Sequence, residues 1–165
     1  MLHIKAVEPG TLSLLKILME LPSLQSFSLV GGTALALRYG HRSSIDLDLF
    51  YHEEFDQIQI INELEYTFKH KFVYKQQNTK FGIFCFIDDI KVDIVHFPHL
   101  PISEIDIEDA IRIYSIADIA AMKIQAILGR GKKGSLHIVV GKRKERIAHQ
   151  NLLSSSRTGS SFSIR

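Results

Sequence analysis

The stretch SLVGGTALALRYGHRSSIDLDLF, residues 28–50, carries strong and consecutive structural signals in this chain of 165 residues. It begins with a short apolar run that is typical of a buried strand, and Gly31-Gly32-Thr33 interrupts that run. Residues 34–39 predict two turns of helix, ended by Gly40 where helices favour glycine. Residues 45–49 then alternate apolar and acidic side chains, which is the period of a β-strand.

This order of elements suits the binding of a nucleotide and a metal ion. Gly31 and Gly32 let the backbone approach a ligand closely, and Thr33 is a candidate cap for a helix whose free N–H groups favour a phosphate. Asp46 and Asp48 are two residues apart on a strand, so both side chains point to one face. Adjacent carboxylates repel each other unless a cation lies between them, and Mg²⁺ prefers such oxygen ligands. The stretch therefore predicts a phosphate cradle followed by a metal-binding strand, as nucleotidyl transfer requires.

The same residues resemble a known motif. In polymerase-β-like nucleotidyltransferases, Gly-Gly or Gly-Ser precedes a short helix and then Asp-x-Asp. The string Gly-His-Arg-x-Ser-x-Asp-x-Asp-x-Phe, here Gly40 to Phe50, is typical of the abortive-infection toxin nucleotidyltransferases of the AbiEii type. The alternative, a Gly-Gly turn beside a strand with two solvated acids, leaves the whole combination to chance. The resemblance covers about residues 11–133 and implies an α+β (α/β) fold like the nucleotidyltransferase palm, with a small, mixed, mostly antiparallel sheet flanked by helices.

The resemblance also implies an activity. A protein of this family would transfer a nucleotide from a nucleoside triphosphate to an acceptor hydroxyl, with Mg²⁺ (or Mn²⁺) as the metal. In studied members the acceptor is the 3′ end of tRNA, and a cognate antitoxin reverses the growth arrest. Asp46 and Asp48 would hold the metal on the triphosphate, whereas Gly31, Gly32 and Thr33 would cradle its β and γ phosphates.

Asp93 is a candidate third carboxylate. It is the one acidic residue in the apolar run 90–97, which predicts the return strand of a hairpin with its turn at Asp88-Asp89. A buried carboxylate needs a partner or a metal. By resemblance, Asp93 matches the catalytic, metal-binding carboxylate that the superfamily places on a strand beside Asp-x-Asp. The alternative is an edge-strand aspartate that faces water.

Lys123 is the last candidate site residue. Ser115 and Asp118 resemble a capping box, and they begin an apolar-periodic helix that Gly129 is expected to stop. On this helix Lys123 matches the family's active-site lysine, which would contact the nucleotide phosphates or stabilise developing charge. The alternative is a lysine at the boundary of the apolar face, with its charge in water.

Periodic apolar positions predict the flanking elements. Residues 12–21 predict a packing helix with Thr11 as its cap, and residues 54–69 predict a second helix. The apolar face of the second helix is expected to consist of Phe55, Ile58, Ile61, Leu64 and Phe68. Strands are predicted at residues 72–75, 81–87 and 90–97.

Composition narrows the class of protein. With 45% hydrophobic residues, the chain is long enough for one domain with a core. No apolar run is long enough to span a membrane, and the N-terminus has no signal-peptide pattern. The single cysteine, Cys85, lies in an apolar run. We therefore expect a buried thiol and a location in the reducing cytoplasm.

Charge is distributed unevenly along the chain. From Arg130 onwards there are nine Lys/Arg and one acidic residue, against eleven and seventeen before it. We expect a C-terminally incomplete nucleotidyltransferase domain at residues 1–129 and a disordered, basic, Ser-rich tail at residues 130–165. The aspartate that the family usually has after the lysine helix is missing, and a frameshift near Lys133 is one explanation.

Two other functions remain open from the sequence. The missing aspartate is compatible with a truncated, catalytically inactive remnant that binds nucleotide. The basic tail is compatible with a nucleic-acid-binding module, whose affinity would fall steeply with salt.

Overall fold

The computed structural model describes residues 1–40, 43–74 and 81–131, and for residues 129–131 the backbone alone. The chain divides into two compact units, Met1–Ala120 and Ala121–Arg165. In the described ranges, no helix has both the length and the apolar character that a membrane span needs.

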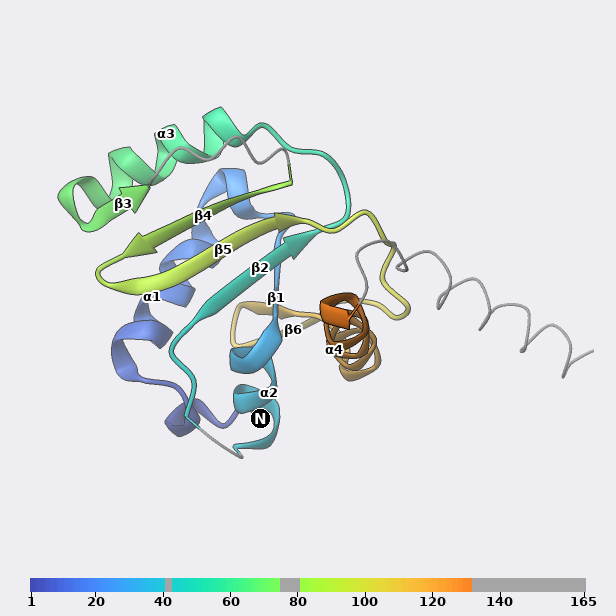
Figure 1. Cartoon of the computed structure of the whole chain (residues 1–165). Coiled ribbons are helices and arrows are strands. Elements are labelled where there is room, and N and C mark those ends of the chain that lie inside the picture. The colour runs from blue at the N-terminus through green and yellow to red at the C-terminus, as the bar shows by residue number, and fades with distance from the viewer. Residues whose placement is uncertain (41–42, 75–80, 132–165) are drawn as a thin grey trace, which may run out of the picture. The chain divides into compact units, whose positions relative to one another are not determined.

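The first unit is built on a mixed β-sheet (Figure 1). Its strands are β1 (Ser28–Val30), β2 (Leu47–Tyr51), β3 (Phe72–Tyr74), β4 (Gly82–Ile87), β5 (Ile90–His96), β6 (Asp106–Glu108) and β7 (Ile111–Ile113). They lie in the order β3-β4-β5-β2-β1-β7-β6. The pairs β2–β5 and β1–β7 are parallel, and the other neighbouring strands in the described residues are antiparallel. The prediction of a mixed, mostly antiparallel sheet with flanking helices is confirmed.

In the described residues, every helix except the last begins at another residue than predicted. They are α1 (Pro9–Glu20), α2 (Gly31–Tyr39), α3 (Gln57–Phe68) and α4 (Ile116–Gly131), with short 3₁₀ helices at Ile4–Ala6, Pro22–Leu24 and Lys69–Lys71. Helix α1 starts at Pro9, because proline suits the first helical position. Thr11 therefore lies inside the helix instead of capping it. Its buried hydroxyl donates a hydrogen bond of 3.3 Å to the carbonyl oxygen of Ile45.

Helix α3 has a side-chain cap, and its buried face differs from the predicted one. The side chain of Asp56 accepts hydrogen bonds from the N–H groups of Ile58 at 2.9 Å and Gln59 at 3.2 Å, so the helix begins at Gln57. Ile60 and Leu64, four residues apart, are the buried residues of this helix. The predicted position of Ile58 on the apolar face is wrong, since 71% of this residue is exposed.

The hairpin of β6 and β7 was not predicted from the sequence. Strands of three residues are too short to display a period of two. Asp109 and Ala110 form its turn with positive φ angles of 51° and 62°. The guanidinium of Arg112 holds the hairpin to the core by donating hydrogen bonds to the carbonyl oxygens of Met19, Leu24 and Phe27.

Helix α4 begins as predicted and ends later. The N–H group of Asp118 donates to Oγ of Ser115 at 3.1 Å, which confirms this cap. The helix continues through Gly129 to Gly131, so the predicted stop is wrong; glycine inside a helix costs only about 1 kcal/mol relative to alanine. Nearly all of the predicted tail, including the proposed frameshift position near Lys133, lies outside the described residues.

The two faces of the central strands differ in polarity. Leu47, Leu49, Val92 and Ile94 are fully buried on one face, and Figure 1 shows α1 behind the strands. The prediction of a buried Cys85 is confirmed: burial, with a smaller contribution from the negative charge of Asp93, raises the pKa of its thiol to about 12. The opposite face carries Asp48 and Asp93, and it is the face on which the candidate site lies.

Candidate active site

Asp48 and Asp93 are neighbours across two strands. Asp48 of β2 pairs with Asp93 of β5 in the parallel register, so their side chains project from the same face of the sheet. Strand β5 lies between β4 and β2, and only 14% of the Asp93 side chain is exposed. The alternative of an edge-strand aspartate facing water is therefore wrong. Two carboxylates that the sequence separates widely meet at the centre of the sheet.

Gly31 brings the start of α2 against this pair. Its φ is +73°, and a Cβ atom built on it would lie 2.1 Å from Oδ2 of Asp48. Only glycine combines this conformation with this approach. Helix α2 starts at Gly31, so Gly31 and Gly32 form its first turn instead of a loop before it. The N–H groups of a first helical turn have no partner within the helix, and here they begin beside a carboxylate.

Thr33 is a structural anchor of the site. The predicted cap is wrong, because Thr33 is the third residue of α2 and the cap position, Val30, makes no side-chain cap bond. Thr33 is fully buried, and its hydroxyl donates to the carbonyl oxygen of Asp46. Oγ of Ser44 lies 2.8 Å from Oγ1 of Thr33 and completes its hydrogen bonding as the donor. Helix α2 thereby holds the backbone just before β2.

Asp46 lies just before the strand that was expected to contain it. Strand β2 begins at Leu47, so Asp46 is on the approach to the strand, with an exposed side chain. Its negative charge still acts on Asp48, where it is one of the causes of a raised pKa. Asp46 thus belongs to the same acidic cluster, on its solvent side.

Asp48 carries the strongest electrostatic signature of the site. Burial is the largest cause of its shift, followed by the negative charge of Asp93, and together with Asp46 they raise the pKa of Asp48 to about 6 although Lys91 lowers it. Burial and neighbouring negative charge both favour the protonated form of a carboxyl group unless a cation compensates them. Perturbed carboxylates of this kind are typical of functional sites.

Lys91 places a cation beside Asp93. Its Nζ lies 2.5 Å from Oδ2 of Asp93. The other carboxylate oxygen of Asp93, Oδ1, is buried and has no hydrogen-bond partner among the described residues. Sequence reasoning missed Lys91, although a lysine two positions before Asp93 on a strand must share its face.

The donor set suits a hard divalent cation. All the candidate ligands are carboxylate oxygens, and one buried oxygen of Asp93 lacks a partner in the part of the chain that is described. Across those residues no group of three or more His, Cys, Asp or Glu side chains is already arranged to hold a metal ion. Asp48 and Asp93 therefore fit a metal by chemistry and position, and a full set of ligands would require side-chain movement or a bound phosphate.

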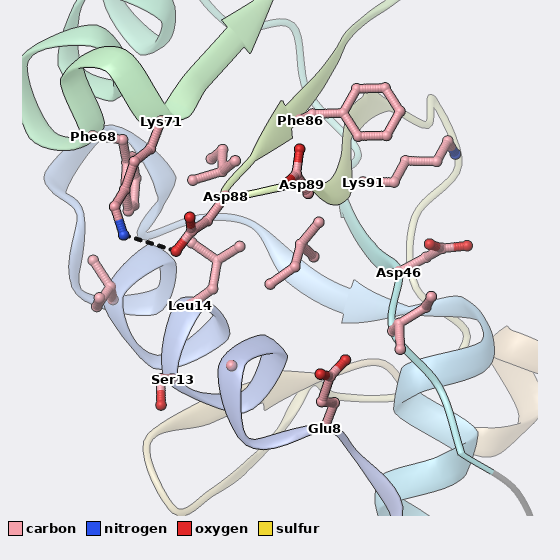
Figure 2. A pocket seen from close by; sticks show the side chains of 15 residues that line it. Glu8, Ser13, Leu14, Asp46, Phe68, Lys71, Phe86, Asp88, Asp89 and Lys91 are labelled. Carbon is pink, nitrogen blue, oxygen red and sulfur yellow. Dashed lines mark hydrogen bonds and ion pairs between the residues drawn. The ribbon is translucent and has the colours of Figure 1, made fainter.

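A cleft of about 700 Å³ adjoins the acidic cluster. Figure 2 shows Asp46 and Lys91 on one side of it and the ion pair of Lys71 and Asp88, 2.8 Å long, on the other. The turn at Asp88-Asp89 that closes β4 and β5 was predicted correctly. The cleft gives a ligand access to the exposed side of Asp46.

Lys123 lies on α4, and its side chain is exposed. It belongs to the unit Ala121–Arg165, whereas Asp46, Asp48 and Asp93 belong to the other unit. Its role at the site stays a prediction from the resemblance.

Comparison with known proteins decides the family. The family described as nucleotidyl transferase AbiEii toxin, type IV toxin–antitoxin system, matches residues 13–138, more than half of the chain. The chain belongs to the AbiEii family. This confirms the family resemblance that the motif in residues 40–50 indicated. The match includes Asp46, the strand of Asp48, the strand of Asp93 and the helix of Lys123.

Relatives of this AbiEii-family chain include an uncharacterized protein of Aquifex aeolicus, 36% identical over 111 residues, which are 65% of this chain and 52% of the relative. Among solved structures, JHP933 from Helicobacter pylori is 22% identical, with a TM-score of 0.45, over 73% of this chain and 58% of that chain. A candidate nucleotidyltransferase of H. pylori is 21% identical, with a TM-score of 0.46, over 72% and 59%. The chain thus spans little more than half the length of these relatives.

Proposed function

We propose that this chain is a metal-dependent nucleotidyltransferase that moves a nucleoside monophosphate from a nucleoside triphosphate to an acceptor hydroxyl. The observation that carries the proposal is the in-register pair Asp48 and Asp93, packed against the first turn of α2 at Gly31. Membership of the AbiEii nucleotidyltransferase toxin family supports the reaction class. The proposal extends to an RNA acceptor, the 3′ end of tRNA, to a cognate antitoxin partner and to a cytoplasmic location.

The acidic cluster would hold the metal. Asp46, Asp48 and Asp93 would bind Mg²⁺ or Mn²⁺, and the metal, when bound, would neutralise triphosphate charge and favour loss of the acceptor's hydroxyl proton. Asp93 has a buried oxygen without a hydrogen-bond partner in the described residues, so that atom could accept a hydrogen bond from the acceptor hydroxyl.

The start of α2 would hold the phosphates. The backbone N–H groups of Gly31, Gly32 and Thr33 lie in its first turn, where a helix dipole favours an anion. The Thr33 hydroxyl is already bonded to the backbone of Asp46, so its part would be to hold the metal-binding segment in place. Lys123 would add positive charge to the phosphates, as the family resemblance implies.

Transfer of label tests this function directly. Each α-labelled nucleoside triphosphate is incubated with total tRNA and Mg²⁺, beside Asp48→Asn and Asp93→Asn variants. We expect label in tRNA with the wild type and a loss of about 100-fold or more in the variants, because the carboxylates contribute to transition-state stabilisation. Asp88→Asn is a matched control, since this exposed aspartate pairs with Lys71 on the far side of the cleft.

One further candidate is a nucleotide-binding protein without transfer activity. It is favoured by the absence of an aspartate in residues 119–138, the end of the stretch that matches the family. Saturable binding of a labelled nucleoside triphosphate without transfer to tRNA or any other RNA would support this candidate and contradict the proposed nucleotidyltransferase.

A nucleic-acid-binding module would give another result. RNA binding that falls steeply with salt and survives Asp48→Asn, without nucleotide transfer, would support it.

A further inference from the structure

Lys91 lies where a metal ion would have to compete with it. It is two residues from Asp93 on β5, so both side chains leave the sheet on the face that carries Asp48. Its Nζ is 2.5 Å from Oδ2 of Asp93, and its positive charge also acts on Asp48. The ammonium group is therefore the counter-ion of this acidic cluster in the metal-free protein.

A bound divalent cation would need the same carboxylate. Oδ2 of Asp93 is engaged by Lys91, whereas Oδ1 is buried and has no hydrogen-bond partner in the described ranges. Two cations that share one carboxylate lie within about 5 Å of each other, where their repulsion is substantial in a half-buried site. A metal ion on Oδ1 and the ammonium group of Lys91 on Oδ2 would therefore repel each other.

We propose that Lys91 is a positioning residue whose ammonium group holds the metal-free carboxylates together and leaves Asp93 when a divalent cation binds. This inference rests on the proposed metal-dependent function. Lys91 has room to move, because its side chain is 45% exposed and lines the cleft together with Asp46 and Phe86 (Figure 2). When no metal is bound, the lysine thus reduces the repulsion between the carboxylates, and it lowers their affinity for metal.

Lys71 provides a matched control. It lines the same cleft, its side chain is 49% exposed, and it pairs with Asp88 at 2.8 Å. In the described residues Lys71 forms no hydrogen bond or ion pair with Asp46, Asp48 or Asp93, and Figure 2 shows it across the cleft from Asp46. Replacing either lysine removes one positive charge from the chain, and only the change at Lys91 removes it from the carboxylates.

The test is a Mn²⁺ titration of the full chain without nucleotide, with free Mn²⁺ read by electron paramagnetic resonance. We expect Lys91→Met to bind Mn²⁺ about tenfold more tightly than the wild type, because a repelling unit charge has been removed. Lys91→Arg, which keeps the charge, should stay close to the wild type, and Lys71→Met should be unchanged. Lys91→Gln provides a second neutral variant should the methionine variant fold poorly.

The melting temperature of the metal-free protein provides a second test of the role of Lys91. We expect Lys91→Met to melt below Lys71→Met in EDTA and to gain more than the wild type from added Mn²⁺, since the metal replaces the lost counter-ion. An Mn²⁺ affinity of Lys91→Met and Lys91→Gln that equals or falls below that of the wild type would overturn the inference.

The two proposals fail in different ways. Asp48→Asn tests the metal site itself. If Asp48→Asn loses Mn²⁺ and Lys91→Met matches the wild type, only the role of Lys91 is wrong. If Asp48→Asn binds Mn²⁺ as the wild type does, or if neither the wild type nor Lys91→Met binds it, the metal site and the inference both fall. Binding by Lys91→Met alone would support both.

Discussion

Gly31 is the residue at which backbone conformation and site chemistry meet. Its φ of +73° is costly for other residues, and any Cβ there would overlap the carboxylate of Asp48. The glycine therefore serves two purposes: it allows α2 to begin immediately after β1, and it leaves space for a carboxylate beside the helix start.

We expect Gly31→Ala to lower the free energy of unfolding by about 2 kcal/mol or more, from backbone strain and overlap with Asp48. Urea denaturation of the wild type and the variant measures this change in the free energy of unfolding. Gly10→Ala is the control, because nothing lies within 4 Å of a Cβ built at Gly10 in helix α1. The control should be neutral or slightly stabilising; equal effects of both changes would contradict the tight approach of Gly31 to Asp48.

Asp48 should make the metal-free protein less stable as the pH rises. Its pKa is raised from 3.8 to about 6, mainly by burial and then by Asp93, so the folded state binds the proton more tightly than the unfolded chain. The stabilisation is therefore complete below about pH 4 and is lost as the pH rises through about 6, by on the order of 3 kcal/mol.

Urea denaturation in EDTA between pH 4 and pH 7 tests this. Asp48→Asn should remove most of the decrease over this range and should be more stable than the wild type at pH 7. Asp89→Asn, an exposed change in the β4–β5 turn, should leave the slope as it is. A wild-type slope that survives in Asp48→Asn would mean that another group is responsible.

At the scale of elements, a side-chain cap sets the residue at which a helix begins. Asp56 accepts two backbone hydrogen bonds at the start of α3, and Ile60 and Leu64 are the residues that this helix buries. The apolar period also predicted Ile58 on the buried face, because the period alone does not show which apolar side chains meet the rest of the fold. Likewise, Ser115 fixes the start of α4, and the carboxylate of Asp118 accepts a 2.7 Å hydrogen bond from the N–H of Ile102.

We expect Asp56→Ala to lower the free energy of unfolding by about 1 kcal/mol, because two N–H groups at the start of α3 lose their partner. Asp56→Ser, which keeps an acceptor, should restore most of the loss. Thermal or urea denaturation of these variants beside Glu54→Ala, an exposed change just before the cap, measures the effect. A loss in Glu54→Ala as large as in Asp56→Ala would argue against the cap.

At the scale of the whole molecule, metal binding should stabilise the folded chain. The cluster of Asp46, Asp48 and Asp93 is assembled only by the sheet and α2, so the unfolded chain offers no equivalent site. We expect Mn²⁺ at about 100 times its dissociation constant to raise the melting temperature by roughly 5–10 °C. Asp48→Asn and Asp93→Asn should lose this increase, and Asp88→Asn should keep it; an increase that persists in the first two would place the metal elsewhere.

Much of the local structure could be predicted from the sequence. The strand before Gly31, the end of α2 at Gly40, the Asp88-Asp89 turn and the cap at Ser115 are each specified by residues that are neighbours in the chain. Glycine in the left-handed region ends α2 because Gly40 has φ of 63° and its N–H donates to the carbonyl oxygen of Ala36 at 2.8 Å. Local signals of this kind depend on backbone sterics and nearby hydrogen bonds, which adjacent residues contain.

The sequence by itself thus determined the family, the mixed sheet with its helices, and the residue types of the site. Only the tertiary structure decided that Asp48 lies in register with Asp93, that Lys91 forms an ion pair with Asp93 and that Gly31 packs against Asp48. It also showed that Thr33, which was expected to cap α2, donates a hydrogen bond to the backbone carbonyl oxygen of Asp46. The physical reason is that strand pairing, burial and close approach bring together residues that are far apart in the chain. A local hydrophobic pattern does not show which of these residues will be in contact.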